Sequence, residues 1–120
     1  MAPAPRPSAA ILLEPSTVSA ATLVTLAGDL DLAHRWSLHR ALAASLSRAP
    51  NLVVDVRRVA FMDCSVLRVL VAAHERAAGV GGRLTIVGAQ RMPLRLLRDT
   101  GLHRVFRLRD SLAAVAVEEA

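Results

Sequence analysis

The sequence predicts a single α/β domain whose sheet is mixed, mostly parallel, with about five strands and about four covering helices. Short apolar runs rich in β-branched residues alternate with segments of helical periodicity, which is typical of this class. A chain of 120 residues suits one domain with a sizeable core. We expect this domain to span residues 10–120, and residues 1–9, with three prolines, to form a disordered tail.

Composition excludes several classes of protein. All 15 basic residues are Arg, and the net charge of +5 is spread along the chain, without interleaved aromatic residues. We therefore expect no nucleic-acid partner. The apolar runs are too short to span a bilayer, and Met1 to Ser8 lacks an apolar signal core. These observations favour a soluble cytoplasmic protein without a membrane partner.

The first half of the domain begins with a predicted hairpin of strands, Ala10–Glu14 and Ala21–Ala27. The segment Gly28-Asp29-Leu30-Asp31 is expected to break the second strand, and Asp31 to cap a helix over Leu32–Ser47. Asp29 and Asp31 could form a carboxylate pair for acid–base chemistry, but a cap is the better interpretation of Asp31. Four residues of the helix are expected to point inward: Trp36, Leu38, Leu42 and Leu46.

The stretch from Asn51 to Val71 organises the rest of the chain. It opens with a buried strand, Leu52–Val56, and continues through a basic turn at Arg57 and Arg58. The period then changes to that of an amphipathic helix ending near Ala78, with Asp63 as its N-cap. Cys64 and Ser65 therefore lie in a first turn with unpaired N–H groups and a positive helix dipole.

The last third adds a glycine-rich turn at Gly79–Gly82 and a buried strand at Arg83–Val87. A helix with Pro93 in its first turn follows, and ends before Thr100-Gly101. A short strand is predicted over Leu102–Leu108, with Val105 and Phe106 in the core. Asp110-Ser111 then caps a final helix, Leu112–Glu119.

Few residues offer chemistry. The single cysteine, Cys64, excludes an intramolecular disulfide and a cysteine-cluster metal site. Its position at a helix start favours a reactive thiol, but the neighbouring Asp63 opposes a thiolate, so we expect a small unreactive side chain that fills the turn. The four histidines lack metal-ligand spacing and are expected at the surface: His34, His39, His74 and His103. We expect no metal and no cofactor.

Four features in order resemble one family. They are Gly28-Asp29-Leu30-Asp31, then Phe61-Met62-Asp63-Cys64-Ser65-Val66-Leu67, Gly81-Gly82, and Thr100-Gly101-Leu102 with Val105-Phe106. From about Ile11 to its end, the chain resembles the STAS domain of bacterial anti-sigma factor antagonists. The resemblance implies a binding protein and not an enzyme.

The resemblance also implies a partner and a switch. Family members bind an anti-sigma factor that is a serine kinase of ATPase fold, and so free a sigma factor for transcription. The kinase phosphorylates the Ser directly after the Asp, and a phosphatase restores binding. Here Cys64 stands at the position of that Ser and Val66 at that of a Gly, so the usual acceptor is missing. Ser65 is the neighbouring candidate phosphoacceptor.

The partner surface that the resemblance implies combines the loop after the second strand with the start of the central helix. Its candidate residues are Asp29, Asp31, Leu32, His34, Met62, Asp63, Cys64, Ser65, Val66, Leu67 and Arg68. Arg68, one turn beyond Cys64, is a candidate contact for a phosphate or an acidic partner. The alternative is a small cysteine- or serine-dependent enzyme or ligand-binding domain that uses the Cys64-Ser65 turn. That alternative needs a nearby base and a pocket, for which short connections leave little room.

Overall fold

Five strands form one sheet in sequence order in the computed structural model, which describes residues 10–15 and 21–119. Strand β1 pairs antiparallel with β2, and the pairs β2–β3, β3–β4 and β4–β5 are parallel. The predicted mixed, mostly parallel sheet is therefore confirmed. The predicted disordered tail over residues 1–9 lies outside the described residues. The strands are β1 (Ala10–Pro15), β2 (Thr22–Leu30), β3 (Leu52–Met62), β4 (Leu84–Val87) and β5 (Arg107–Arg109).

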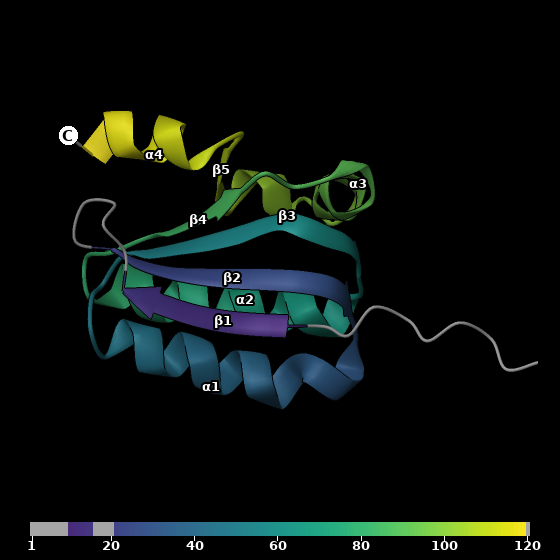
Figure 1. Ribbon diagram of the computed structural model, residues 1–120, viewed down its shortest axis with the longest axis horizontal. Helices are drawn as coiled ribbons and strands as arrows, with labels where there is room; N and C mark the ends of the chain where they lie inside the picture. Colours follow the sequence, from purple (N-terminus) through teal and green to yellow (C-terminus); the bar gives the residue numbers. More distant parts are fainter. Residues whose placement is uncertain (1–9, 16–20, 120) are drawn as a thin grey trace, which may run out of the picture.

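Helices cover both faces of this sheet (Figure 1). α1 (Arg35–Leu46) and α2 (Cys64–Gly79) lie along one face, and α3 (Arg91–Asp99) and α4 (Leu112–Glu119) lie over the other. Two short 3-10 helices, η1 (Leu32–His34) and η2 (Leu102–Arg104), precede α1 and follow α3. α1 follows β2 and α2 follows β3, so both run back along the sheet in the same direction. Within the described residues, no helix has both the length and the apolar character that crossing a bilayer requires.

The central strand β3 explains why both faces are covered. Its first residues are buried on alternate sides: Leu52, Val54 and Val56 join the main core, and Val53 joins a smaller cluster with Val115 of α4. A parallel strand buried on both faces shows a continuous apolar run and not an alternating one. The predicted strand composition is therefore confirmed at its N-terminal half.

β2 and β3 are both longer than predicted. Arg57 and Arg58 do not form a turn, because β3 continues through them to Met62 with both side chains exposed. Gly28 and Asp29 likewise do not end β2, which absorbs two register shifts and stays paired until Leu30 meets Met62. Exposed arginines are tolerated here because only the backbone takes part in the ladder. The extension carries both strands to Leu30 and Met62, which are buried in the main core directly before the helices begin.

Three smaller predictions were wrong. Trp36 is not in the core: 64% of it is exposed, since two residues turn a helix by roughly 200° and so separate it from the buried Leu38. The predicted strand over Leu102–Leu108 is the helix η2 followed by the shorter β5. In this segment Phe106 is buried as expected, but Val105 is 42% exposed.

A buried carboxylate, that of Asp55, lies in β3 just before the exposed Arg57 and Arg58. Asp55 is 4% exposed, and its carboxylate accepts bonds from the Arg57 backbone N–H at 3.0 Å and from the guanidinium at 2.8–3.1 Å. Burial raises the pKa of the Asp55 carboxyl, but the Arg57 bonds and the charges of Arg57 and Arg58 together hold it below its ordinary value. The folded state therefore favours the ionised carboxylate.

The Asp55–Arg57 pair predicts acid sensitivity. A carboxyl whose pKa is lowered on folding stabilises the protein above its unfolded pKa, near 4, and this contribution is lost as the pH falls through the folded value. We expect Asp55→Asn to reduce the free energy of unfolding by about 1–2 kcal/mol at pH 7. The difference in this free energy between the variant and the wild type should become smaller below about pH 4. Urea unfolding between pH 2 and pH 7 measures both quantities.

The matched control is Asp99→Asn. Asp99 is exposed, and its Oδ2 lies 3.8 Å from the Nε of the exposed Arg95. Removal of the Asp99 charge should therefore change the free energy of unfolding by less than about 0.5 kcal/mol at any pH. Equal effects of the two substitutions would contradict the assignment to Asp55.

Candidate functional site

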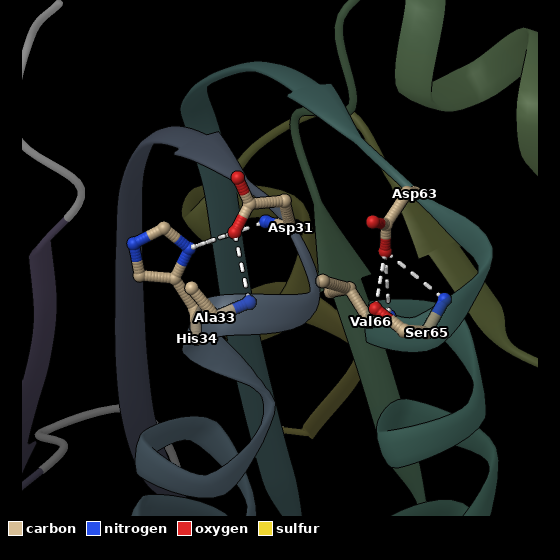
Figure 2. A network of polar contacts seen from close by, with 6 residues as sticks. All are labelled: Asp31, Ala33, His34, Asp63, Ser65 and Val66. Carbon is tan, nitrogen blue, oxygen red and sulfur yellow. Dashed lines mark hydrogen bonds and ion pairs between the residues drawn. The ribbon is translucent and has the colours of Figure 1, made fainter.

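The starts of two helices lie side by side at the carboxyl ends of β2 and β3 (Figure 2). Leu30 and Met62 are paired across these strand ends, and each is followed directly by an aspartate, Asp31 or Asp63. The Asp63 backbone N–H donates to the Leu30 carbonyl at 3.2 Å, which ties the two turns together. The carboxyl ends of adjacent parallel strands thus bring both predicted segments of the site to one edge.

Asp31 is a helix cap, as predicted, but it caps η1, whereas the N-cap position of α1 is His34. Its Oδ1 accepts a bond from the Ala33 N–H at 2.9 Å, and the His34 Nδ1 accepts one from the Asp31 N–H at 3.2 Å. These reciprocal bonds form a capping box that starts η1. The carboxylate is therefore used by the backbone, and Asp29, which lies within β2, does not share this arrangement.

Asp63 caps α2, also as predicted. Its Oδ1 accepts bonds from the backbone N–H groups of Ser65 at 3.0 Å and Val66 at 3.3 Å, and from the Ser65 hydroxyl at 2.5 Å (Figure 2). Burial raises the pKa of the Asp63 carboxyl, but these bonds and one from the Leu32 backbone outweigh it and lower that pKa. Asp63 is thus ionised at neutral pH, and the Ser65 hydroxyl is engaged as a donor.

Cys64 is exposed, which corrects the expectation of a side chain that fills the turn. It lies between two hollows and lines both of them, together with Arg68. The larger hollow, of about 670 Å³, lies between α1 and α2, and the smaller, of about 270 Å³, extends toward Thr100 and Leu102. Both hollows are open to the surface, in keeping with short connections that leave little room for an enclosed pocket.

The predicted site residues divide into two groups. The structure brings eight of them to the surface of this edge as exposed or half-buried residues: Asp29, Asp31, Leu32, His34, Asp63, Cys64, Ser65 and Arg68. Met62, Val66 and Leu67 are at most 5% exposed and belong to the main core, so their inclusion as partner contacts is corrected. At positions 66 and 67 the helix turns its apolar stripe toward the sheet.

Sequence reasoning missed the contribution of α1 to this site. Trp36 lines the larger hollow, with the Arg35 guanidinium 5.0 Å from its ring centroid and the His39 ring edge-on at 6.3 Å. The sequence did contain a signal for this position, because residues two apart in a helix, such as Trp36 and Leu38, face nearly opposite sides. The exposed Phe61 of β3 and Met92 of α3 line a further small hollow.

The four histidines lie in different surroundings. Within the described part of the chain, no group of three or more potential ligands lies close enough to hold a metal ion. His39 is exposed as predicted, but His74 and His103 are half-buried, and the buried Nδ1 of each has no hydrogen-bond partner. His34 is also half-buried, so the expected surface position is confirmed in full only for His39, and His74 packs edge-on against Phe106 at 5.7 Å.

Comparison with known proteins matches this architecture to one family. The family described as "Mlab, STAS domain" matches residues 14–112. An anti-sigma factor antagonist from Mycobacterium paratuberculosis is 25% identical, with a TM-score of 0.82 over 92% of this chain and 93% of its own. No curated protein matches the sequence significantly.

Two more distant structures share the fold. The unphosphorylated form of the anti-sigma factor antagonist SpoIIAA, a Bacillus cell fate determinant, is 16% identical, with a TM-score of 0.71 over 91% of this chain and 96% of its own. The murine anion transporter Slc26a9 is 14% identical, with a TM-score of 0.73 over 87% of this chain but only 18% of its own. The fold thus occurs in free-standing regulators and as part of transporters. With the family match over most of its length, this chain belongs to the STAS domain family and has the fold of its anti-sigma factor antagonists.

Proposed function

We propose that this protein is an anti-sigma factor antagonist that binds a kinase-type anti-sigma factor of ATPase fold and thereby frees a sigma factor. The observation that carries the proposal is the exposed residue directly after the Asp63 cap, Cys64, which shares a hollow with the exposed apolar side chains of Leu32 and Trp36. Exposed apolar residues around a polar centre suit a protein interface. The near full-length similarity to the antagonist from Mycobacterium paratuberculosis supports the same function.

The replacement of the usual acceptor gives this antagonist a different regulation. A serine kinase needs a hydroxyl, and Cys64 offers none. The Ser65 hydroxyl donates to Asp63, so a phosphate on Ser65 would remove that bond and bring about two negative charges beside a carboxylate. We therefore expect a binder that phosphorylation at this turn does not switch off, controlled by its synthesis or by competition with other antagonists.

The alternative of a cysteine- or serine-dependent enzyme has less support. His39 lines the same hollow as Cys64 and Ser65, so a candidate general base lies near both candidate nucleophiles. Its ring, however, packs edge-on against Trp36, and the hydroxyl of Ser65 is bonded to a carboxylate. A nucleophile needs a base within hydrogen-bond reach. Binding without catalysis is therefore the function that we propose.

Partner capture with phosphate analysis tests the proposed function. We expect a pull-down with the purified protein to recover an ATPase-fold anti-sigma factor, and mass spectrometry to find no phosphate on Ser65 after incubation with that factor and ATP. Cys64→Ser restores an exposed hydroxyl and should gain a phosphate on residue 64. Cys64→Glu, which mimics the charge, should weaken binding by roughly tenfold or more.

Ser65→Ala serves as the control for the acceptor, because it removes the other hydroxyl and leaves residue 64 unchanged. Phosphate on wild-type Ser65 would overturn the regulatory part of the proposal alone. Failure of both the wild type and Cys64→Ser to bind any such factor would overturn the function itself.

Thiol chemistry separates the binding protein from the enzyme. Since Cys64 is the single cysteine and is exposed, iodoacetamide should label only this residue, at a rate similar to that of glutathione at the same pH. We expect the bound anti-sigma factor to protect Cys64, and the alkylated protein to bind that factor at least about tenfold more weakly, as for a residue at the centre of an interface. A rate more than tenfold above that of glutathione would instead favour an activated nucleophile.

A further inference from the structure

The surface between α1 and α2 extends well beyond the turn that carries Cys64. Both helices begin at the same edge of the sheet and run in the same direction (Figure 1). The seam between them therefore has an N-terminal end, where both helices begin, and a C-terminal end. The hollow of about 670 Å³ lies at the N-terminal end of this seam, and a second hollow of about 230 Å³ lies at its C-terminal end. The twelve residues of α1 span roughly 18 Å, the length of about three helical turns.

The seam with its two end hollows, which we call the α1–α2 groove, is lined in these hollows largely by small and apolar side chains. Val69 and Ala72 of α2 line its N-terminal hollow, and Ala43 and Leu46 of α1 line its C-terminal hollow. Trp36 stands at one mouth, 64% exposed and oriented by contacts with Arg35 and His39. An exposed and already oriented tryptophan suits an interface anchor, because it loses little freedom on binding.

The charged side chains that line the two hollows of this groove have one sign. Arg35 and Arg68 line its N-terminal hollow and Arg76 its C-terminal hollow, while no acidic side chain lines either of them. Asp31 and Asp63 line a separate hollow, where both accept bonds from helix N–H groups. An occupant with carboxylates spaced along one side would therefore meet complementary charge at both ends of the groove.

We propose that the α1–α2 groove binds an acidic amphipathic helix of the partner protein. The apolar stripe of that helix packs on Trp36, Val69 and Ala72, and its carboxylates face Arg35, Arg68 and Arg76. The inference rests on the proposed function, since the helix would belong to the anti-sigma factor, and the groove is continuous with Cys64 through the shared hollow. A helix fits better than a small anion, because the guanidinium groups lie at both ends of the seam.

A designed peptide pair tests the groove without the partner. The first peptide is an 18-residue helix with Leu at i, i+3, i+4 and i+7 spacing and Glu on both flanks, and the second has every Glu replaced by Lys. Trp36 is the single tryptophan, so its emission reports occupancy directly. We expect the Glu peptide to shift this emission to the blue and to bind at least about tenfold more tightly than the Lys peptide, with weaker binding at high salt.

Charge variants locate the peptide by fluorescence anisotropy of a labelled Glu peptide. Arg35→Ala, Arg68→Ala and Arg76→Ala should each weaken binding by roughly two- to fivefold, as expected for exposed charge pairs. Trp36→Ala should weaken it by roughly tenfold or more. Arg98→Ala is the matched control, since Arg98 is an exposed arginine of α3, over the opposite face of the sheet, and should leave binding unchanged.

Three results would overturn the proposal. The first is equal affinity for the Glu and Lys peptides, or no binding of either at millimolar concentration. The second is a loss in Arg98→Ala as large as in Arg68→Ala. The third is an equal shift of Trp36 emission by inorganic phosphate, which would indicate a small-anion site instead of a helix site.

The same variants, measured against the purified anti-sigma factor, separate this inference from the proposed function. If the factor binds the wild type and Arg76→Ala equally and leaves Trp36 emission unchanged, the groove assignment is wrong and the antagonist function stands. If no anti-sigma factor binds while the peptide results hold, the groove is an acidic-helix site and the proposed function is wrong.

Discussion

The site depends on one carboxylate, that of Asp63. This carboxylate accepts two backbone N–H bonds and one hydroxyl bond at the start of α2. The backbone N–H of Asp63 in turn donates to the carbonyl of Leu30. A single residue therefore fixes the end of β3, the end of β2 and the first turn of α2 relative to one another. Without such a cap, the first turn of α2 would have unpaired N–H groups and less reason to present Cys64 in one orientation.

The length of β2 and β3 determines where this cap lies. Both strands stay paired up to the core residues Leu30 and Met62, and β2 does so only by absorbing two register shifts. The helices that follow them begin at the same edge, which sets the exposed side chains of η1, α1 and α2 beside one another. Parallel strands place functional residues at their carboxyl ends for this general reason. Here the result is a surface of exposed aromatic and basic side chains around a thiol, and not an enclosed pocket.

Periodicity and cap residues predicted the elements and their order, because hydrophobic spacing and N-cap chemistry are local properties. Asp31 and Asp63 were identified as caps in this way, and the alternation of apolar strands with helices predicted the parallel sheet. The continuation of β3 through Arg57 and Arg58 could not be predicted locally, since it depends on pairing with β2 and on the Asp55 carboxylate. The order of neighbouring strands likewise depends on contacts between residues distant in the sequence.

The site was predicted in part. The loop after β2 and the start of α2 were identified from the resemblance, but the core positions Met62, Val66 and Leu67 were included because the motif was taken as a continuous segment. A helix presents only some of its residues to one side. The contribution of Trp36 was missed through an incorrect assignment of the helical face, although its angle to Leu38 was available in the sequence.

The most direct test of this account is hydrogen–deuterium exchange of the protein alone and bound to the anti-sigma factor that it recovers. The account predicts that binding slows exchange in residues 31–40 and 63–72, while residues 91–99 of α3 exchange as in the free protein. Slower exchange confined to α3 and α4, with η1 and the start of α2 unchanged, would show that the partner binds the opposite face and would contradict the assignment of the site.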